Sequence, residues 1–517
     1  MTTSISNASA AEATHRDEAT LAPSNADASV GRPAAAQTEQ RTIASRFIIL
    51  VLCLAVGLSA LAFGTVHSWS LAFFQAGAAL VVILWAYDAW RTRKLRVSRN
   101  LLQLPLLGLF IVGLVQLLPF GSQLAAGDGG AVGGLTNAPV NSLTLDPYST
   151  RFVLIQLASL LVYFGGALVF IDSPKRLRLV VRMVTVFGFL LALFAMLQYF
   201  VNPTQIYWLR QPKYALPFGP FINRHHFAAY MELTIALPLG LLLSGAVAAE
   251  RRLLYLFAVV IMTLALMLTG SRGGILSLAA ETFFLIAVAG LVRRRDRRDD
   301  GVAAEGSRVR AALLRVGLGF ALVVALILGA LSLGGEESLG RLLGTVNSDD
   351  PTSGRVQFWQ GTWEVIKHHP VLGVGLGAFS VAYTRYDVLN GTSRLEQAHN
   401  DYLQILADAG IVGGALGLAF VLALFAYGFA RINSKDKFRS GVAAGALAGC
   451  FAVLVHSFFD FSLHMTSNAL LFLVLAALAT LNGRVEEADT SQHRKRRRHR
   501  SHRPHAGRGL NAETRES

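Results

Sequence analysis

The sequence predicts an all-α polytopic membrane protein with about twelve transmembrane helices and a partly helical external loop between the ninth and the tenth. Of its 517 residues, 53% are hydrophobic and only 15% are charged, whereas soluble proteins carry about 25% charged residues. Apolar runs of about 18 residues or more, long enough to cross a bilayer, recur along the chain. Helices are predicted because they satisfy their own backbone polar groups inside lipid.

Each predicted transmembrane helix corresponds to one apolar run. In chain order the runs are 46–63, 70–90, 101–118, 152–171, 179–200, 227–247, 254–270, 274–292, 314–333, 411–430, 441–457 and 465–482. Only the sequence GSRGG separates the seventh run from the eighth. Because each of these two runs is long enough to cross the bilayer alone, we predict a tight helical hairpin there.

Basic residues follow every second predicted helix, and this alternation orients the chain. The residues after the second, fourth, sixth, eighth and tenth helices are Arg91, Arg93, Lys94, Arg96, Arg99, Lys175, Arg176, Arg178, Arg251, Arg252, Arg293, Arg294, Arg295, Arg297, Arg298, Arg431, Lys435, Lys437 and Arg439. Cytoplasmic loops of membrane proteins carry an excess of lysine and arginine. We therefore predict that these loops and both termini are cytoplasmic.

The two ends of the chain differ in composition from the membrane domain, which we place at residues 41–484. Residues 1–40 are too poor in apolar side chains to fold, so a disordered cytoplasmic arm is expected. Residues 485–517 form a basic cytoplasmic tail and contribute to the net charge of +15. Basic clusters beside membrane helices orient the chain or contact anionic membrane lipids. Without an aromatic platform, they do not indicate nucleic-acid binding.

The longest predicted external loop, residues 334–402, precedes the tenth helix. Part of it has helical periodicity, because Arg355, Trp359, Thr362, Trp363 and Ile366 would share one helix face. Proline and glycines in the sequence HHPVLGVGLGAF end that helix. Long loops of this kind are usually functional or disordered, and we predict a small, partly ordered external cap.

Arginines on the external side break the charge pattern and are therefore candidates for anion binding. Arg272, in LTGSRGGILS, lies at the membrane boundary beside a serine and glycines that would let an anion approach. The alternative for Arg272 is snorkelling, or pairing with Glu281. Arg355, in DDPTSGRVQFW, opens the cap helix, and its alternative is a surface salt bridge to Asp349 or Asp350.

A further external arginine, Arg224, stands beside His225 and His226 in FGPFINRHHFAAYMEL. Its position just before the sixth predicted helix suits a ligand-binding residue. It suits an interfacial anchor equally well.

His399 is the strongest candidate for acid–base chemistry, in the stretch LEQAHNDYLQILADAG. On a helix predicted to open at about residue 398, Leu403, Leu406 and Gly410 would continue the face of His399, and Asp401, Gln404 and Asp408 would form a polar face. A neutral imidazole at the membrane boundary can accept a proton from a hydroxyl. The alternative is a capping or core histidine.

Together, these arginines and His399 suit one reaction. Bidentate arginines can hold a diphosphate leaving group, while the histidine deprotonates an attacking sugar hydroxyl. The residues thus indicate glycosyl transfer from a lipid-linked diphosphate, with no metal or cofactor expected. His456, Asp460 and His464 have the i, i+4, i+8 spacing of a metal ladder. We do not predict a metal site there, because the stretch joins two membrane helices and its order suggests a turn.

Five motifs give the chain a family resemblance over residues 46 to 482. They are FINRHHFAAYMEL, TGSRGGILSL, SGRVQFWQGTWEVIKHHPVLGVGLGAF, AHNDYLQILADAGIVGG and HSFFDFSLHMTSNALLF. In this order the chain resembles the O-antigen ligase and O-antigen polymerase superfamily of bacterial envelope enzymes. The resemblance implies a dozen transmembrane helices, a large periplasmic loop, an undecaprenyl-diphosphate glycan donor and metal-independent transfer with inversion at the anomeric carbon.

The resemblance also implies roles for individual residues. His399 matches the family's essential loop histidine, Arg272 the arginine of its GSR turn, and Arg355 the arginine near the start of its loop. Arg224 matches a further arginine, although a paired HH follows it where many members have one Asn or His. His226 and Asn400 lie in the same motifs and complete the expected substrate-binding set.

The acceptor is the open part of this hypothesis. A ligase would move finished glycan to lipid A-core in the bacterial inner membrane, with its active site facing the periplasm, and this is the reading we favour. A polymerase would join two lipid-linked units, and protein O-oligosaccharyltransferases share the loop histidine. A glycolipid transporter would instead predict internal repeats and broken helices at mid-membrane, and it would leave His399 without a task.

Overall fold

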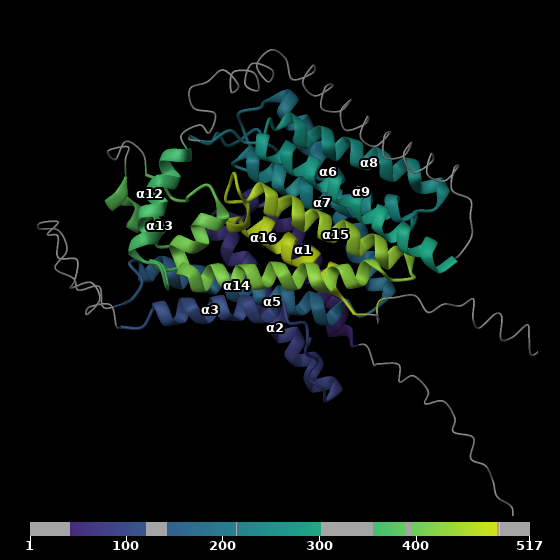
Figure 1. The fold of residues 1–517 in the computed structure, drawn as a ribbon, viewed down its shortest axis with the longest axis horizontal. Helices are drawn as coiled ribbons and strands as arrows, with labels where there is room; N and C mark the ends of the chain where they lie inside the picture. The colour runs from purple at the N-terminus through teal and green to yellow at the C-terminus, as the bar shows by residue number, and fades with distance from the viewer. Residues whose placement is uncertain are drawn as a thin grey trace, which may run out of the picture. The chain divides into compact units, whose positions relative to one another are not determined.

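The computed structural model describes residues 42–119, 142–213, 215–300, 355–387, 394–482 and 485, with side chains described except at 291–300. Within these ranges every regular element is a helix, and the only strand-like pairings are two isolated bridges. The all-α prediction is therefore confirmed for the described part of the chain (Figure 1).

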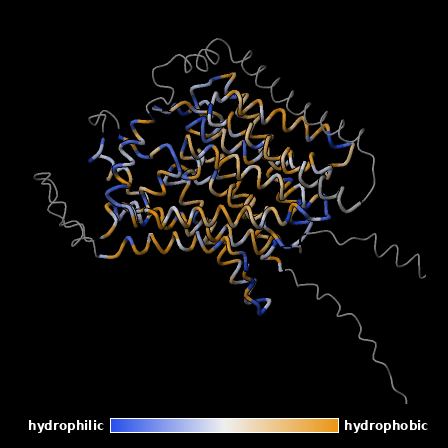
Figure 2. The backbone as a smooth tube through the Cα atoms, viewed as in Figure 1, coloured by the Kyte–Doolittle hydropathy of each residue, from blue (hydrophilic) through white to orange (hydrophobic). Residues whose placement is uncertain are grey.

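Nine of the described helices are long and apolar enough to cross a membrane. They are α1 (Ile43–Leu61), α2 (Ser68–Thr92), α5 (Pro147–Phe170), α6 (Pro174–Val201), α7 (Arg224–Ser244), α8 (Ala249–Leu268), α9 (Arg272–Asp300, apolar to Gly290), α14 (Asp401–Ile432) and α15 (Lys437–His456). The chain is thus a multi-pass membrane protein. Figure 2 shows hydrophobic residues along the helix bodies and hydrophilic residues gathered toward the helix ends.

Two further apolar helices are shorter than the apolar runs that predicted them. Helix α3 (Gln103–Gln116) lies within the run 101–118, and α16 (Thr466–Thr480) lies within 465–482. The predicted helix 314–333 lies outside the described residues, as do the residues 1–41 and 486–517 of the predicted arm and tail. The predicted hairpin is present, since α8 and α9 are separate helices joined at Thr269–Ser271.

Helices α7 and α15 are packed closely against each other, and their packing brings the polar residues at the start of α7 near those at the end of α15. Small residues allow the approach: a Cβ added to Gly445 would collide with the backbone of Ala236 on α7. Such contacts between small residues let membrane helices pack backbone to backbone. The two helices are antiparallel, so Arg224 at the start of α7 lies at the same end of the bundle as His456 at the end of α15. This end is called the site end below.

The described part of the external cap consists of α12 (Arg355–His368), α13 (Phe379–Tyr383) and the short helix η3 (Thr384–Tyr386). Helix α12 begins and ends where its motif predicted, with Pro370 just beyond it. The cap lies beside the start of α14 (Figure 1). The Trp359 indole donates a hydrogen bond to the Ala398 carbonyl at 3.1 Å.

A kink at Gly410 separates the first two turns of α14 from its membrane-spanning part. Gly410 has φ 62° and ψ −162°, a conformation that residues with a Cβ rarely adopt. The cap loop occupies the kink, because the Ile411 amide donates to the Pro370 carbonyl at 2.8 Å. Gln116 at the end of α3 fixes the same junction, donating to the carbonyls of Leu372 at 2.6 Å and Asp408 at 2.8 Å.

Candidate active site

The predicted site residues all lie at or next to helix starts. They are Arg224 and His226 on α7, Arg272 on α9, Arg355 on α12, and His399 and Asn400 immediately before α14. A buried carboxylate, Asp460, lies among them in the turn that follows α15. Asp460 is paired with His399 and interacts electrostatically with His226 and Arg355. The fold therefore brings residues from five separate chain segments to one place.

His399 faces Asp460 from a strained backbone position. Its Nδ1 lies 3.4 Å from Asp460 Oδ1, and its side chain is 30% exposed. Its ring packs between Phe358, with centroids 5.9 Å apart, and Phe461, at 4.9 Å. With Nδ1 directed at a carboxylate, the other ring nitrogen, Nε2, is the one that can accept a proton. A carboxylate behind a histidine in this way stabilises the imidazolium that forms.

The helical placement of His399 was wrong. Asn400 is the N-cap of α14 and accepts hydrogen bonds from the Tyr402 and Leu403 amides at 2.9 and 3.0 Å. His399 therefore precedes the helix, with a left-handed φ of 52°, and shares no face with Leu403. Non-glycine residues held in that region cluster at functional sites.

The expected polar face of this helix is buried. Asp401, Gln404 and Asp408 are at most 7% exposed. Gln404 accepts a hydrogen bond from the Ala398 amide at 2.7 Å and donates one to Asp408 at 3.2 Å. Asp408 also accepts from the Gly377 amide at 3.3 Å. These side chains hold the segment that carries His399 against the cap.

Asp460 is ionised despite being only 1% exposed. Burial alone would raise its pKa, but the hydrogen-bonding contact with His399, with a smaller contribution from the neighbouring histidines, holds the pKa of Asp460 well below its usual range. Hydrogen bonding to the charged form of a buried carboxylate favours that form. Asp460 can therefore orient His399 and counter a proton that the imidazole takes up.

The GSR turn connects the arginines to the histidines. Ser271 caps α9 by accepting the Gly274 amide at 3.2 Å, and its hydroxyl lies 2.8 Å from His225 Nδ1. Arg224 reaches the same turn, since a Cβ added to Gly270 would lie 3.8 Å from its Nη1. Sequence reasoning left His225 out of the predicted site, and it used Ser271 only as a neighbour of Arg272 that would let an anion approach.

Arg355 and Arg272 are close enough to perturb each other. Burial and the positive charge of Arg272 lower the pKa of Arg355, and Asp460 partly opposes them. Two neighbouring guanidinium groups repel each other, and an anion between them relieves the repulsion. Glu281, the alternative partner of Arg272, is fully buried, and neither of its carboxylate oxygens has a partner within the described residues. The alternative partners of Arg355, Asp349 and Asp350, lie outside those residues.

His226 and Asn400 support the site from behind. The ring of His226 packs edge-on to Phe461 at 4.8 Å, and Phe461 in turn contacts His399. Asn400 is 8% exposed and donates a hydrogen bond to the Phe458 carbonyl at 3.1 Å. Both contacts are made to the turn that carries Asp460. In this structure His226 and Asn400 therefore hold that turn, and with it Asp460, in place.

The spacing of His456, Asp460 and His464 does not place them on one helix, because α15 ends at His456. His456 Nδ1 lies 2.8 Å from Glu232 Oε1 on α7. His464 Nδ1 lies 2.6 Å from Asp401 Oδ1, and this contact raises the pKa of His464 although burial would lower it. Each member of the supposed ladder thus has a different partner. Asp460 was the member that belonged to the site.

An apolar groove of about 430 Å³ opens between α9, α14 and α15, beside the site. Its walls are mainly aromatic, formed by Phe284, Tyr402, Phe425, Phe429, Phe451 and Phe458 with three aliphatic residues. Tyr402 and Phe458 link the groove to the segments that carry His399 and Asp460. An elongated apolar chain could lie in the groove while its polar end reaches the arginines.

A multi-pass helical protein with a histidine–carboxylate pair and clustered arginines at one membrane boundary has groups that can bind an anion and accept a proton at the same place. Residues 257–418 match a family model described as O-Antigen ligase. This part of the chain is therefore similar to the O-antigen ligase family, and the match supports the resemblance to the O-antigen ligase superfamily for the three motifs that lie within it. The matched range contains Arg272, Arg355 and His399, whereas Arg224 and Asp460 lie outside it. No curated protein matches the chain.

Proposed function

We propose that this chain is an O-antigen ligase, which transfers glycan from an undecaprenyl-diphosphate donor to a hydroxyl of lipid A-core, with inversion and without a metal. The observation that carries the proposal is the His399–Asp460 pair, 3.4 Å apart, next to clustered arginines and above an apolar groove. The family description of residues 257–418 supports the same class of reaction.

The donor would use both parts of the site. Its diphosphate would lie against Arg272 and Arg355, with Arg224 at the adjacent turn, because guanidinium groups bind phosphate oxygens in a bidentate manner. Its polyprenyl chain would follow the aromatic groove. The anomeric carbon, which is bonded to the diphosphate, would then lie at the polar mouth of the groove near His399.

The chemical step would be a single displacement. The acceptor hydroxyl loses its proton to His399 Nε2 as its oxygen bonds to the anomeric carbon. The bond from that carbon to the diphosphate oxygen breaks, and the diphosphate departs with the electron pair. The arginines stabilise the charge that develops on the leaving group, while Asp460 stabilises the imidazolium. Attack from the face opposite the leaving group inverts the anomeric carbon.

The basic loops support a periplasmic site in the bacterial inner membrane. Helix α7 begins at the site end and is followed by Arg251 and Arg252, and α15 ends at the site end and is preceded by Lys435. By the positive-inside rule these basic segments face the cytoplasm. The site end would therefore face the periplasm, where lipid-linked glycans and lipid A-core meet.

Reconstitution with alternative acceptors tests the proposal. Purified full-length protein would receive an undecaprenyl-diphosphate glycan and either lipid A-core, a second lipid-linked unit, or an acceptor protein, with and without EDTA. We expect glycan to be transferred to lipid A-core and to neither of the other acceptors. The rate of transfer should be the same with and without EDTA. Products only with one of the other acceptors would replace the ligase by a polymerase or a protein glycosylase. Loss of activity with EDTA would refute the metal-free step.

A further inference from the structure

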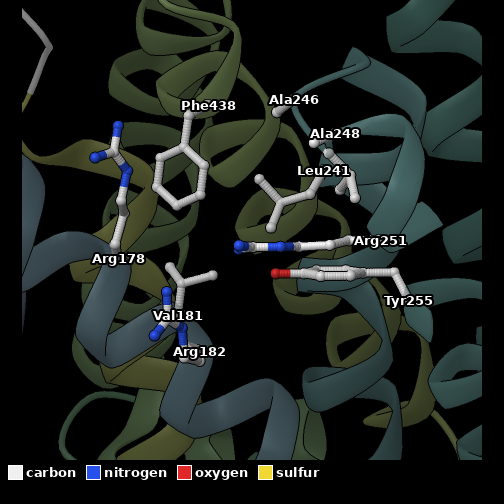
Figure 3. A pocket seen from close by; sticks show the side chains of 10 residues that line it. Arg178, Val181, Arg182, Leu241, Ala246, Ala248, Arg251, Tyr255 and Phe438 are labelled. Carbon is white, nitrogen blue, oxygen red and sulfur yellow. The ribbon is translucent and has the colours of Figure 1, made fainter.

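At the end of the bundle opposite the site, three arginines surround a second cavity, of about 180 Å³ (Figure 3). It lies where α7 ends and where α6, α8 and α15 begin. Its lining includes Arg178, Arg182 and Arg251 with the aromatic side chains Tyr255 and Phe438, and its 10 lining residues include no acidic one. Helix α7 contains 21 residues, so about 30 Å of helix separates this cavity from the candidate active site.

Helical spacing directs these side chains into one space. Arg178 and Arg182 are four residues apart on α6, and Arg251 and Tyr255 are four residues apart on α8, so each pair lies on one helix face. Figure 3 shows Arg251 and Tyr255 extending side by side toward the interior of the cavity. The guanidinium carbon of Arg178 lies 5.4 Å from the centre of the Phe438 ring, which holds this arginine at the edge.

The turn between α7 and α8 forms one wall of the cavity. Gly245 ends α7 in the left-handed region, with φ 70°, and Ala246 to Ala248 then line the cavity. The Arg252 side chain donates to the Val247 carbonyl at 3.2 Å and so fixes the turn. The two adjacent arginines therefore have different roles. Arg252 binds a backbone carbonyl of the turn, whereas Arg251 lines the cavity.

Nearby arginines that serve the fold are buried against protein acceptors. Arg439, next to Phe438, is fully buried and donates to the carbonyls of Leu478, Ala479 and Leu481 at 2.8 to 3.1 Å. In contrast, Arg182 and Arg251 are exposed and line a cavity whose 10 lining residues include no carboxylate. Several guanidinium groups around a small space suit an anion with several oxygens, of which phosphate is the common biological example.

The surfaces beside the cavity indicate where such a phosphate comes from. Leu179 on α6 and Leu254 and Phe257 on α8 are 53%, 63% and 51% exposed. In a membrane protein, exposed apolar side chains on spanning helices face lipid. We propose that this cavity binds the phosphate group of an anionic phospholipid, whose acyl chains lie along the apolar faces of α6 and α8. Free phosphate shares the headgroup chemistry and is the competing source.

A double variant with a matched control tests the site. In Arg182→Gln/Arg251→Gln two lining charges are removed, whereas in Lys175→Gln/Lys435→Gln two exposed charges of the same end are removed from outside the lining. Binding to the full-length protein in neutral detergent would be measured by native mass spectrometry. The probes are dioctanoyl phosphatidylglycerol, dioctanoyl phosphatidylcholine and inorganic phosphate.

Wild type and the lysine control should bind phosphatidylglycerol equally and in preference to phosphatidylcholine. The arginine variant should bind it about 25-fold more weakly, because each basic residue near an anionic surface contributes about fivefold. Equal binding by both double variants, or no preference over phosphatidylcholine, would refute the site. Inorganic phosphate that displaces the lipid and binds as tightly would refute the lipid source and identify free phosphate as the ligand. Neither outcome bears on glycan transfer, because Arg182 and Arg251 lie outside the candidate active site.

Discussion

The two ends of the α7–α15 pair both contain arginines near the membrane boundary, yet they use them differently. At the opposite end, Arg439 is buried and bonded to three carbonyls at the end of α16, where helix carbonyls lack partners of their own. At the site end, Arg355 lies near a second arginine and a buried carboxylate. An arginine surrounded by carbonyls stabilises the fold. Clustered arginines beside a buried carboxylate and a histidine suit an anionic ligand, as the proposed function requires.

The first prediction concerns which side of the membrane each end faces. The site end is expected to face the periplasm and the opposite end the cytoplasm, and both the comparison and the proposed reaction depend on this orientation. Thr384 on the cap and Lys435 before α15 would each be replaced by cysteine, in a background without Cys53 and Cys450. In intact cells an impermeant thiol reagent should label Thr384→Cys and not Lys435→Cys, because the cap is predicted to be periplasmic. The reverse pattern would invalidate the orientation and, with it, the proposed reaction.

Replacing His399 should have the largest effect on catalysis. Loss of a general base lowers a rate by about 100- to 10,000-fold, so His399→Ala should show a turnover loss in that range. Donor binding should persist, because the arginines supply most of the attraction to the diphosphate. Turnover and donor affinity would be measured separately on purified protein. Unchanged turnover, or a loss that parallels a fall in thermal stability, would mean that His399 is structural.

Asp460→Asn should lower the rate of transfer. The low pKa of Asp460 keeps the carboxylate ionised throughout the working range, so the wild type has a negative charge facing the imidazole. A neutral amide at this position cannot stabilise the imidazolium that forms in the chemical step. Turnover should therefore fall, by less than the factor of about 100 to 10,000 expected for loss of the base itself, and donor affinity should be retained. Turnover and donor affinity equal to those of the wild type would contradict the pairing.

Conservative substitution should distinguish the arginines of the two ends. Arg272→Lys keeps the charge but loses the bidentate geometry, and we expect about 10- to 100-fold weaker donor binding, the usual range for one charged hydrogen bond. Arg439→Lys, the matched change at the opposite end, should lower the thermal unfolding temperature and leave donor affinity unchanged. The comparison fails if Arg272→Lys binds the donor as well as wild type does.

The smallest expected effect concerns the His464–Asp401 contact beneath the site. The pKa of His464 is raised in the folded protein, so its stabilising contribution is complete below its unfolded pKa, about 6.5. The contribution is lost as the pH rises through the folded value. Thermal unfolding should show wild type losing about 1 kcal/mol more than His464→Gln between pH 5.5 and pH 8.5. Parallel pH profiles of the two proteins would exclude the contact as a stabilising pair.

Most of the fold was predictable because the relevant signals are local. An apolar run long enough to span lipid becomes a helix wherever it lies, and capping residues such as Asn400 and Ser271 define the starts of α14 and α9 within their own sequence. The periodicity after Arg355 likewise predicted α12. The same local reasoning failed at His399. It began the helix about three residues too early, because α14 starts at Asp401 and the segment that carries His399 is fixed by contacts with the cap and with Asp460.

The sequence by itself determined the helices of the described residues, the chemical types of the candidate site residues and the resemblance to the O-antigen ligase superfamily. Tertiary structure alone decided which side chains meet. Asp460 is 61 positions from His399 in the chain, yet their atoms lie 3.4 Å apart, because the packing of α7, α14 and α15 brings the turn after α15 under the cap. Arg178 and Arg251 meet at a cavity for a similar reason, since α6 and α8 begin at the same end of the bundle. The physical reason is that hydrophobic burial specifies helices residue by residue, whereas a carboxylate or guanidinium acquires its partner only when separate helices pack together.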